Sequence, residues 1–212
     1  MSALSIVTLN VRGLRGQLKR KLVFNWCKRN GFDIVLLQET YSLKSDEKQW
    51  EKEWGGKAVW SHGTNHSCGV AIFFGKKFDF GINDTHIDGN GRIAAAMINV
   101  EDEKFWLINI YAPNTPTAKQ SFFRSVNDLC CNNKVFGEDI ILSGDCNIPL
   151  ELKLDKDKGS EGVVVNDENC NVRKYVNQFI SQNNLSNVCR STYPMRKVLR
   201  GVEQYHLYNV RH

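Results

Sequence analysis

Apolar segments of strand length that stop at polar residues restrict the fold of this chain more than any other feature. The segment Leu4–Leu9 stops at Asn10, and the continuous apolar run 33–37 leads into Glu39. A third segment, 139–145, itself ends in a carboxylate. Continuous apolar runs of this length are consistent with buried strands. Because strand ends on a rigid scaffold can direct side chains into one shared site, the pattern predicts a functional site where these strands end.

Helical patterns lie between and after the predicted strands. Leu18, Leu22 and Trp26 recur at i, i+4 and i+8 with Lys and Arg between them. This is the spacing of an amphipathic helix, which ordinarily turns its apolar stripe toward the core. Further helices are predicted over 118–131 and 172–185, and consecutive strands over 68–74, 92–100 and 105–111. The order predicts an α/β protein in which two sheets pack together with helices outside.

Composition limits the class of protein. The chain has 212 residues, of which 42% are hydrophobic and 24% charged, and this fits one globular domain. There is no membrane-length apolar stretch and no signal-peptide pattern. Seven cysteines without a CxxC pair predict buried free thiols and an intracellular protein, in the nucleus or cytoplasm. We expect a monomer without membrane contact.

The net charge of +5 is unevenly distributed. Residues 1–189 carry 23 Lys or Arg and 22 Asp or Glu, so most of the excess lies in the last residues. Charge alone therefore does not identify a nucleic-acid partner.

The polar residues at the strand ends are of the types that phosphodiester hydrolysis requires. Each has an ordinary explanation by itself: Glu39 and Asp145 as a solvated strand end and a turn residue, Asn10 as a loop opener, and Tyr111 as a core tyrosine. Together, Glu39, Asp145 and Asn10 offer oxygen ligands of the kind that Mg²⁺ takes. Asn147 and Tyr111 are donors able to stabilise a pentacovalent phosphate. The sequence has no competing Ser-His-Asp or Cys-His arrangement at these positions.

Five motifs then point to a family. In order they read SIVTLNVRGL, IVLLQET, CGVAIFF, FWLINIYAPN and IILSGDCN. They resemble the successive motifs of the endonuclease/exonuclease/phosphatase superfamily, and most of all the apurinic-endonuclease-like domain of LINE (non-LTR) retrotransposon polyproteins. The resemblance implies a four-layer α/β/β/α sandwich of the DNase I-like type and Mg²⁺-dependent nicking of DNA at a target site, with Mn²⁺ as an alternative metal.

The resemblance also assigns roles to individual positions. The residues that match Asn10, Glu39 and Asp145 surround the divalent metal in that family, and those that match Tyr111, Asn114 and Asn147 handle the scissile phosphate and its neighbours. On this basis the expected set is as follows: Asn10 and Glu39 for the metal; Tyr111, Asp145 and Asn147 for catalysis; Asn114 and Arg12 for contact with DNA.

Three features depart from the family pattern. Tyr41 stands where the family often has His after Glu-Thr, and Cys146 replaces a bulkier residue. The final Ser-Asp-His motif is absent, and His206 is most simply a tail residue. Loss of a general base commonly slows hydrolysis by about 10²–10⁴-fold.

The C-terminal segment differs from the rest of the chain. We expect an incomplete domain over 4–194 and an atypical tail over 195–212 that lacks the family's next strand and contains most of the basic excess. The tail is interpreted as an out-of-frame ending, which the nucleotide sequence would decide. Loss of the last strands would leave a sheet edge unpaired.

Other functions stay open at this point. One is a catalytically dead remnant that still binds nucleic acid. Another is a repair-type exonuclease or apurinic endonuclease. A third is a phosphatase of the same superfamily acting on lipid or inositol phosphates, which the motif YAPN makes less favoured.

Overall fold

The computed structural model describes residues 4–77, 79–131, 135, 138–148 and 170–187, together with the backbone of 205–209. The described strands form two sheets. The first has the order β1-β2-β4-β3 and the second the order β5-β6-β7-β8-β10-β9. The strands are β1 (Ile6–Asn10), β2 (Ile34–Gln38), β3 (Ala58–Ser61), β4 (Val70–Phe74), β5 (Gly81–Ile87), β6 (Ile93–Val100), β7 (Glu103–Tyr111), β8 (Asp139–Asp145), β9 (Ser186–Asn187) and β10 (Tyr205–Asn209).

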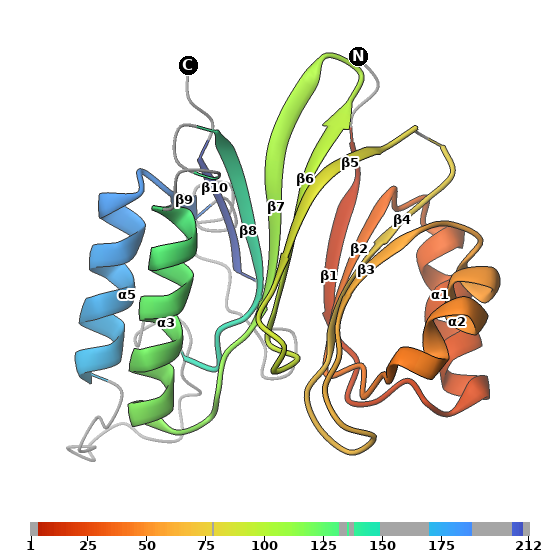
Figure 1. Cartoon of the computed structure of the whole chain (residues 1–212), viewed down its shortest axis with the longest axis horizontal. Coiled ribbons are helices and arrows are strands. Elements are labelled where there is room, and N and C mark those ends of the chain that lie inside the picture. The colour runs from red at the N-terminus through yellow and green to blue at the C-terminus, as the bar shows by residue number, and fades with distance from the viewer. Residues whose placement is uncertain are drawn as a thin grey trace.

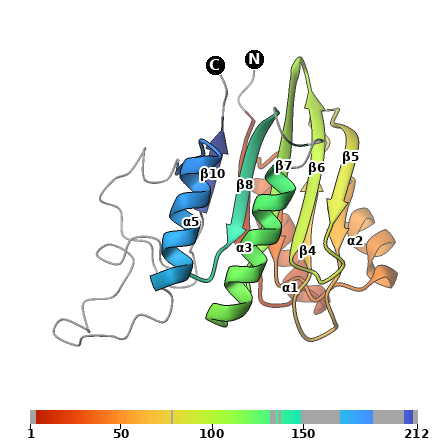
Figure 2. The ribbon, with the colours of Figure 1, turned by 60° about the vertical axis from the view of Figure 1, so that its left-hand side comes forward.

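Helices cover the outer face of each sheet. In Figure 1, α1 and α2 lie outside the first sheet, and α3 and α5 lie outside the second. Figure 2 shows α3 and α5 side by side over the second sheet, with α1 and α2 on the far side of the molecule. The described helices are α1 (Gln17–Arg29), the 3-10 turn η1 (Lys44–Asp46), α2 (Glu47–Trp54), α3 (Pro116–Cys130) and α5 (Cys170–Gln182).

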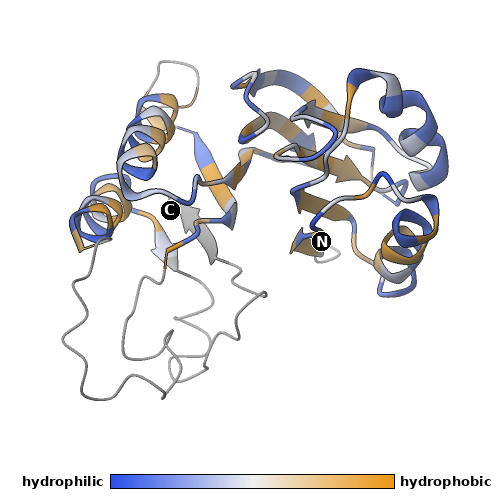
Figure 3. Ribbon diagram, turned by 90° about the horizontal axis from the view of Figure 1, so that it is seen from below, coloured by the Kyte–Doolittle hydropathy of each residue, from blue (hydrophilic) through white to orange (hydrophobic). Residues whose placement is uncertain are grey.

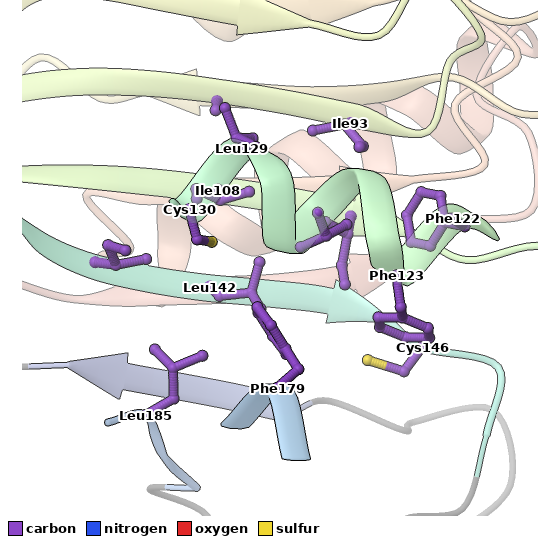
Figure 4. Close-up of a cluster of buried hydrophobic side chains, with 14 of the residues drawn as sticks. Ile93, Ile108, Phe122, Phe123, Leu129, Cys130, Leu142, Cys146, Phe179 and Leu185 are labelled. Carbon is purple, nitrogen blue, oxygen red and sulfur yellow. The ribbon is translucent and has the colours of Figure 1, made fainter. Parts of the chain in front are cut away.

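Three hydrophobic clusters separate the four layers. One fills the space between the sheets and includes Leu36, Ile72 and Leu107. A second lies under α3 and α5, where Figure 4 shows Phe179 next to Leu142 of β8 and Phe123 near Cys146. The third lies under α1 and α2. In Figure 3 the strands are largely orange and much of the outer helical surface is blue, as this layering requires. The predicted α/β/β/α sandwich is confirmed.

The orientation of α1 corrects one expectation. The helix buries Arg20, Phe24 and Cys27, whereas the predicted apolar stripe is exposed: Leu18 is 75% exposed, Leu22 62% and Trp26 47%. The physical reason is that α1 has a second, better anchored face. Phe24 packs edge-on against the rings of Trp54 and Phe73, and the buried Arg20 guanidinium binds the carboxylate of Glu53 at 2.7 Å.

Most other predicted elements are present with shifted ends. The first strand is Ile6–Asn10 rather than Leu4–Leu9, and the helix predicted over 118–131 begins at Pro116. The helix predicted over 172–185 spans 170–182. Strand β5 was not predicted, because its sequence GINDTHI is polar and largely exposed.

The tail contributes to the second sheet. The backbone of β10 pairs antiparallel with β8, with Leu207 opposite Leu142. The expectation of an unpaired edge is therefore wrong for β8, which has β7 on one side and β10 on the other. The remainder of the predicted tail lies outside the described residues, so its out-of-frame origin stays a prediction. In the described parts of the chain, no helix has the length and apolarity needed to span a membrane.

A fully buried polar network joins the two sheets. Asn109 of β7 accepts a hydrogen bond at 2.6 Å from Nε2 of Gln38 in β2, and its own Nδ2 donates at 2.9 Å to the carbonyls of Leu37 and Ala71. Gln38 also donates to Oγ1 of Thr8 in β1. Because all of these groups are removed from water, the network holds β7 in one register against the first sheet.

Replacement of Asn109 tests this network. We expect Asn109→Ala to lower the free energy of unfolding by about 3 kcal/mol, because three buried partners lose a hydrogen bond at once. Asn99→Ala, at an exposed position of the neighbouring strand β6, is the matched control and should change stability by less than about 0.5 kcal/mol. Urea unfolding of the two variants measures the difference. Equal stabilities would contradict a role for Asn109 in joining the sheets.

Candidate active site

The predicted polar residues come together where strands from both sheets end. Asn10 and Tyr111 are the last residues of β1 and β7, and Asp145 is the last residue of β8. The parallel pairs β1·β2 and β7·β8 place Asn10 opposite Gln38 and Tyr111 opposite Asp145. In Figure 1 this is the lower end of the two sheets, opposite the N-terminus.

One amide connects the two sheets at this end. Nδ2 of Asn10 donates a hydrogen bond to Oε1 of Glu39 at 2.8 Å and another to Oδ2 of Asp145 at 2.7 Å. The Asn10 oxygen accepts from the backbone N–H of Arg12. Two carboxylates from different sheets are therefore held within hydrogen-bond distance of the same nitrogen atom. Asn10 acts here as a bridge between them.

Glu39 is surrounded by donors. Partial burial of this carboxyl acts to raise its pKa, but hydrogen bonds from Asn10, Tyr41 and Tyr111 outweigh that effect and the pKa lies below its usual value. The positive charge of Arg12 acts in the same direction. Glu39 is therefore a carboxylate anion at neutral pH, which is the form that binds a cation.

Tyr111 is held as a neutral donor. Burial, and then the negative charge of Glu39, raise the pKa of its phenol. The guanidinium carbon of Arg92 lies 5.1 Å from the centroid of the Tyr111 ring, and its Nη1 donates to the Tyr111 carbonyl at 3.1 Å. Arg92 is in turn placed by Asp88, whose carboxylate accepts its backbone N–H. The sequence reasoning missed Arg92, although its position after the turn DGNG, at the start of a predicted strand, was a usable signal.

Asp145 and Asn147 form a tight turn after β8. The backbone N–H of Asn147 donates to Oδ1 of Asp145 at 2.9 Å, and the Asn147 side chain donates to the carbonyl of Ala112 at 2.7 Å. This second bond ties the turn to the residue after Tyr111. Cys146 between them is buried in the cluster under α3, in line with the packing role expected for it.

Tyr41 takes up the position next to Glu39 that the family often gives to His. Its hydroxyl donates to Oε2 of Glu39 at 2.9 Å, and this bond raises the pKa of the phenol. The ring lies against Gly13, where any added Cβ would overlap it. The departure from the family pattern thus supplies Glu39 with one more donor.

The two residues expected to contact DNA lie at the edge of this group. Arg12 is exposed, and its backbone joins it to Asn10. Asn114 is exposed in the connection between β7 and α3. Neither makes a side-chain hydrogen bond to the carboxylates, so their assignment rests on position alone.

Strained backbone is concentrated at the site. Seven described non-glycine residues have positive φ, and four of them belong to the site or adjoin it: Arg12 (45°), Glu39 (53°), Tyr41 (57°) and Asn147 (50°). Such conformations cost on the order of 1–3 kcal/mol each and persist where the surrounding structure imposes them. Their clustering is an independent indication of a functional site.

The donor set fits a hard divalent cation. Glu39 and Asp145 supply carboxylate oxygens, and Asn10 lies between them. Within the described ranges, there is no cluster of three or more His, Cys, Asp or Glu. A Mg²⁺ ion commonly binds to one or two carboxylates and keeps several waters, so two carboxylates are sufficient for it and insufficient for a structural zinc site.

Among the side chains that the structure describes, no histidine belongs to this group. Among the hydrogen bonds of the described residues, those to Glu39 and Asp145 come from amide, phenol and backbone donors. His62 bonds instead to Ser42 and Glu47. His206 lies opposite Ser143 in the strand register, and its side chain is outside the described part of the chain.

Comparison with known proteins identifies the family. Residues 7–162 match the Endonuclease/Exonuclease/phosphatase family. The chain belongs to this family. It is also 30% identical over 151 residues to the transposon TX1 uncharacterized 149 kDa protein of Xenopus laevis. That match covers 71% of the chain and 12% of the relative, so the chain spans about an eighth of that protein's length.

Solved structures share the fold. An AP endonuclease from Archaeoglobus fulgidus superimposes with a TM-score of 0.70 at 20% identity, over 97% of this chain and 86% of that one. AP endonuclease LMAP from Leishmania major gives 0.74 at 16% identity, over 97% and 79%. The 3′ phosphatase NExo from Neisseria, bound to a product DNA hairpin, gives 0.71 at 22% identity, over 97% and 86%. The resemblance inferred from the five motifs is thereby confirmed for family and fold.

Replacement of Gly144 tests the close backbone contact between β7 and β8 next to the site. Its φ is +139°, and a Cβ there would overlap the carbonyl of Ile110 in β7. We expect Gly144→Ala to lower the free energy of unfolding by at least about 2 kcal/mol, because backbone atoms must move. Gly89→Ala is the matched control, since its φ is also positive but nothing lies within 4 Å of the added carbon. Thermal unfolding of both variants measures this, and a Gly144 variant as stable as the control would contradict the steric argument.

Proposed function

We propose that this chain is a Mg²⁺-dependent phosphodiester hydrolase that nicks DNA. The observation that carries the proposal is the Asn10 amide, which holds Glu39 of one sheet and Asp145 of the other within 2.8 Å of a single atom. Two carboxylates brought together at such a point repel each other unless a donor or a cation lies between them. The Asn10 amide meets this need in the structure, and the two carboxylates that it brings together are close enough to bind one cation in common.

Each residue has a separate role in this proposal. Glu39 and Asp145 hold the metal, and Asn10 keeps their oxygens in place. Bound Mg²⁺ would polarise the phosphoryl oxygen and stabilise charge on the leaving oxygen. Tyr111, a neutral donor that bonds to Glu39 in the structure, can turn this donor to the added negative charge on the phosphate when the metal takes up the Glu39 oxygens, and Asn147 is positioned by Ala112 to donate as well. Arg92 adds positive charge beside Tyr111. Arg12 and Asn114 contact the flanking DNA backbone.

DNA as substrate is supported by the relatives. Two of the matching structures are named AP endonucleases, and a third is a 3′ phosphatase with a DNA hairpin. The transposon protein favours an element-encoded nuclease that nicks a target site. The likeness to the repair enzymes keeps abasic-site cleavage and 3′-phosphate removal as alternative activities of the same site.

A second candidate function is DNA binding without hydrolysis. It is favoured by one observation: no histidine donates to Asp145 or Glu39 among the described residues. A site that retains its carboxylates but has no acid/base partner would bind metal and DNA and turn over slowly.

A plasmid assay separates these functions. We expect slow nicking of supercoiled plasmid in Mg²⁺, and at least a ~10²-fold loss in Glu39→Ala, because one of the two proposed metal carboxylates is removed. Glu103→Ala, at an exposed position of β7, is the control and should nick at the wild-type rate. DNA retained in a gel-shift assay without nicking would establish the binding function instead. Parallel oligonucleotides with an abasic site or a 3′ phosphate identify the preferred reaction.

Metal removal tests the metal requirement separately. Nicking should stop in excess EDTA and return when Mg²⁺ or Mn²⁺ is added, because both are hard cations that oxygen ligands accept. The measurement is the initial rate against free metal concentration, for the wild type and for Asp145→Asn. Loss of one negative charge should shift the half-saturating concentration upward by about tenfold or more. Undiminished nicking in EDTA would rule out a divalent metal in the reaction.

A further inference from the structure

Helix α1 carries a row of exposed hydrophobic side chains that neither the packing of the fold nor the proposed function explains. Among the described residues, the exposed large hydrophobic side chains are Leu18, Leu22, Trp26 and Ile87. Three of these four lie on one face of one helix, one turn apart. Single exposed hydrophobic residues are ordinary on protein surfaces, but an ordered row is typical of an interaction site. We name Leu18, Leu22 and Trp26 the α1 stripe.

Basic side chains surround the α1 stripe. The helix QLKRKLVFNWCKR contains no Asp or Glu. Its exposed charged residues are Lys19, Lys21, Lys28 and Arg29, because Arg20 is buried against Glu53. The α1 stripe is therefore an apolar row flanked by positive charges. It is complementary to a partner surface that has an apolar row flanked by negative charges.

The apolar surface continues beyond the helix. The ring centroid of Trp26 lies 5.4 Å from that of Phe32, and Phe32 lines a groove of about 410 Å³. Three lysines, Lys28, Lys76 and Lys77, and one carboxylate, Asp33, also line this groove; Asp33 pairs with Lys77 at 3.6 Å, which leaves a net positive charge. Stripe and groove together form one elongated surface with apolar residues along it and positive charges beside it.

The spacing favours a helical partner. Side chains at i, i+4 and i+8 form the ridge that packs into the groove of another helix. A second copy of this chain fits poorly, because two such stripes would bring lysines against lysines. Proteins bind single-stranded nucleic acid by stacking aromatic side chains on the bases and by placing basic side chains against the phosphates. Exposed leucines contribute to neither kind of contact.

A flat membrane surface fits less well than a helix. In Figure 1, α1 and α2 lie next to each other on the same face of the molecule. A planar anionic surface would meet α2 as well, and α2 carries Glu47, Glu51 and Glu53 in eight residues. The exposed Lys48 and Lys52 offset these carboxylates, but both tryptophans of α2 are buried, so this helix offers a lipid surface no exposed apolar residue. A single partner helix along α1 need not cover α2.

From these observations we propose that the α1 stripe is a docking surface for an acidic amphipathic helix of a partner protein. The partner's apolar residues cover Leu18, Leu22 and Trp26, and its carboxylates face Lys21 and Arg29. The proposal does not depend on the proposed nuclease function, because the stripe shares no residue with the candidate active site.

A synthetic peptide tests the proposal. The probe is a fluorescein-labelled helix of about five turns with leucines at i, i+3, i+4 and i+7 and glutamates elsewhere. Fluorescence anisotropy with the full chain should give saturable binding with a Kd in the micromolar range, weakening as salt is added. A peptide of the same composition in scrambled order, which has no continuous apolar face, should bind at least about tenfold more weakly.

Variants locate the binding surface. Leu18→Ser combined with Leu22→Ser should weaken peptide binding at least about tenfold, because the apolar contacts are lost. Lys21→Glu combined with Arg29→Glu should weaken it similarly by charge repulsion. Ile87→Ser is the matched control, since it removes an exposed hydrophobic residue from β5, and its binding should equal the wild type. All five positions are exposed, and unchanged thermal unfolding confirms that each variant is folded.

Three outcomes would overturn the proposal. The first is no saturable binding of the acidic peptide. The second is equal binding by the wild type and the double-serine variant. The third is that these variants lose binding to phosphatidylserine vesicles or to an oligothymidine strand while peptide binding is unchanged. Plasmid nicking is measured on the same samples as an independent readout of the proposed nuclease function. Loss or retention of nicking does not change the interpretation of peptide binding at the α1 stripe.

Discussion

The buried hydrogen bonds of Asn109 are the constraint on which the rest of the structure depends. They join β7 to the carbonyls of Leu37 and Ala71 in the other sheet and to the Gln38 side chain. Glu39 directly follows Gln38, and Tyr111 lies two residues after Asn109. A one-residue slip of β7 within its own sheet would turn Asn109 to the opposite face and leave its buried partners in the first sheet unpaired. The same bonds that join the sheets thus set the distance between the two halves of the site.

Several residues of the candidate site, next to this buried network, have strained backbone conformations. Glu39, Tyr41 and Asn147 all have left-handed backbone conformations, which an isolated chain would leave readily. They are retained because the loops that carry them are hydrogen-bonded at both ends: Thr40 to Gly69, and Ala112 to both Asp145 and Asn147. Burial of the three apolar clusters stabilises the fold enough to offset the cost of these strained conformations. The carboxylates of Glu39 and Asp145 are therefore held next to Asn10 before a ligand binds.

The α1 helix shows where sequence patterns reach their limit. Its periodicity correctly predicted a helix, yet two apolar faces were present and the pattern of Leu18, Leu22 and Trp26 was the more regular one. The sheet-facing side proved to be the one with Phe24, Cys27 and Arg20. A buried arginine is unexpected in a core face, and it is favourable here because Glu53 on α2 supplies the opposite charge while the carbonyls of Leu14 and Arg15 accept further hydrogen bonds. That partner is 33 residues away and is not visible from the helix alone.

The sequence by itself determined the family and most of the central strands, and it predicted the polar residues that meet at their ends, because apolar runs and the residues that end them are local properties of the chain. It could not determine that Asn10 bridges Glu39 and Asp145, that Arg92 lies against Tyr111, or which face of α1 is buried. Each of these depends on contacts between segments distant along the chain, and hydrogen-bond geometry between such segments exists only after the two sheets have packed. The strand ends were predictable, but their meeting point was decided by the tertiary structure.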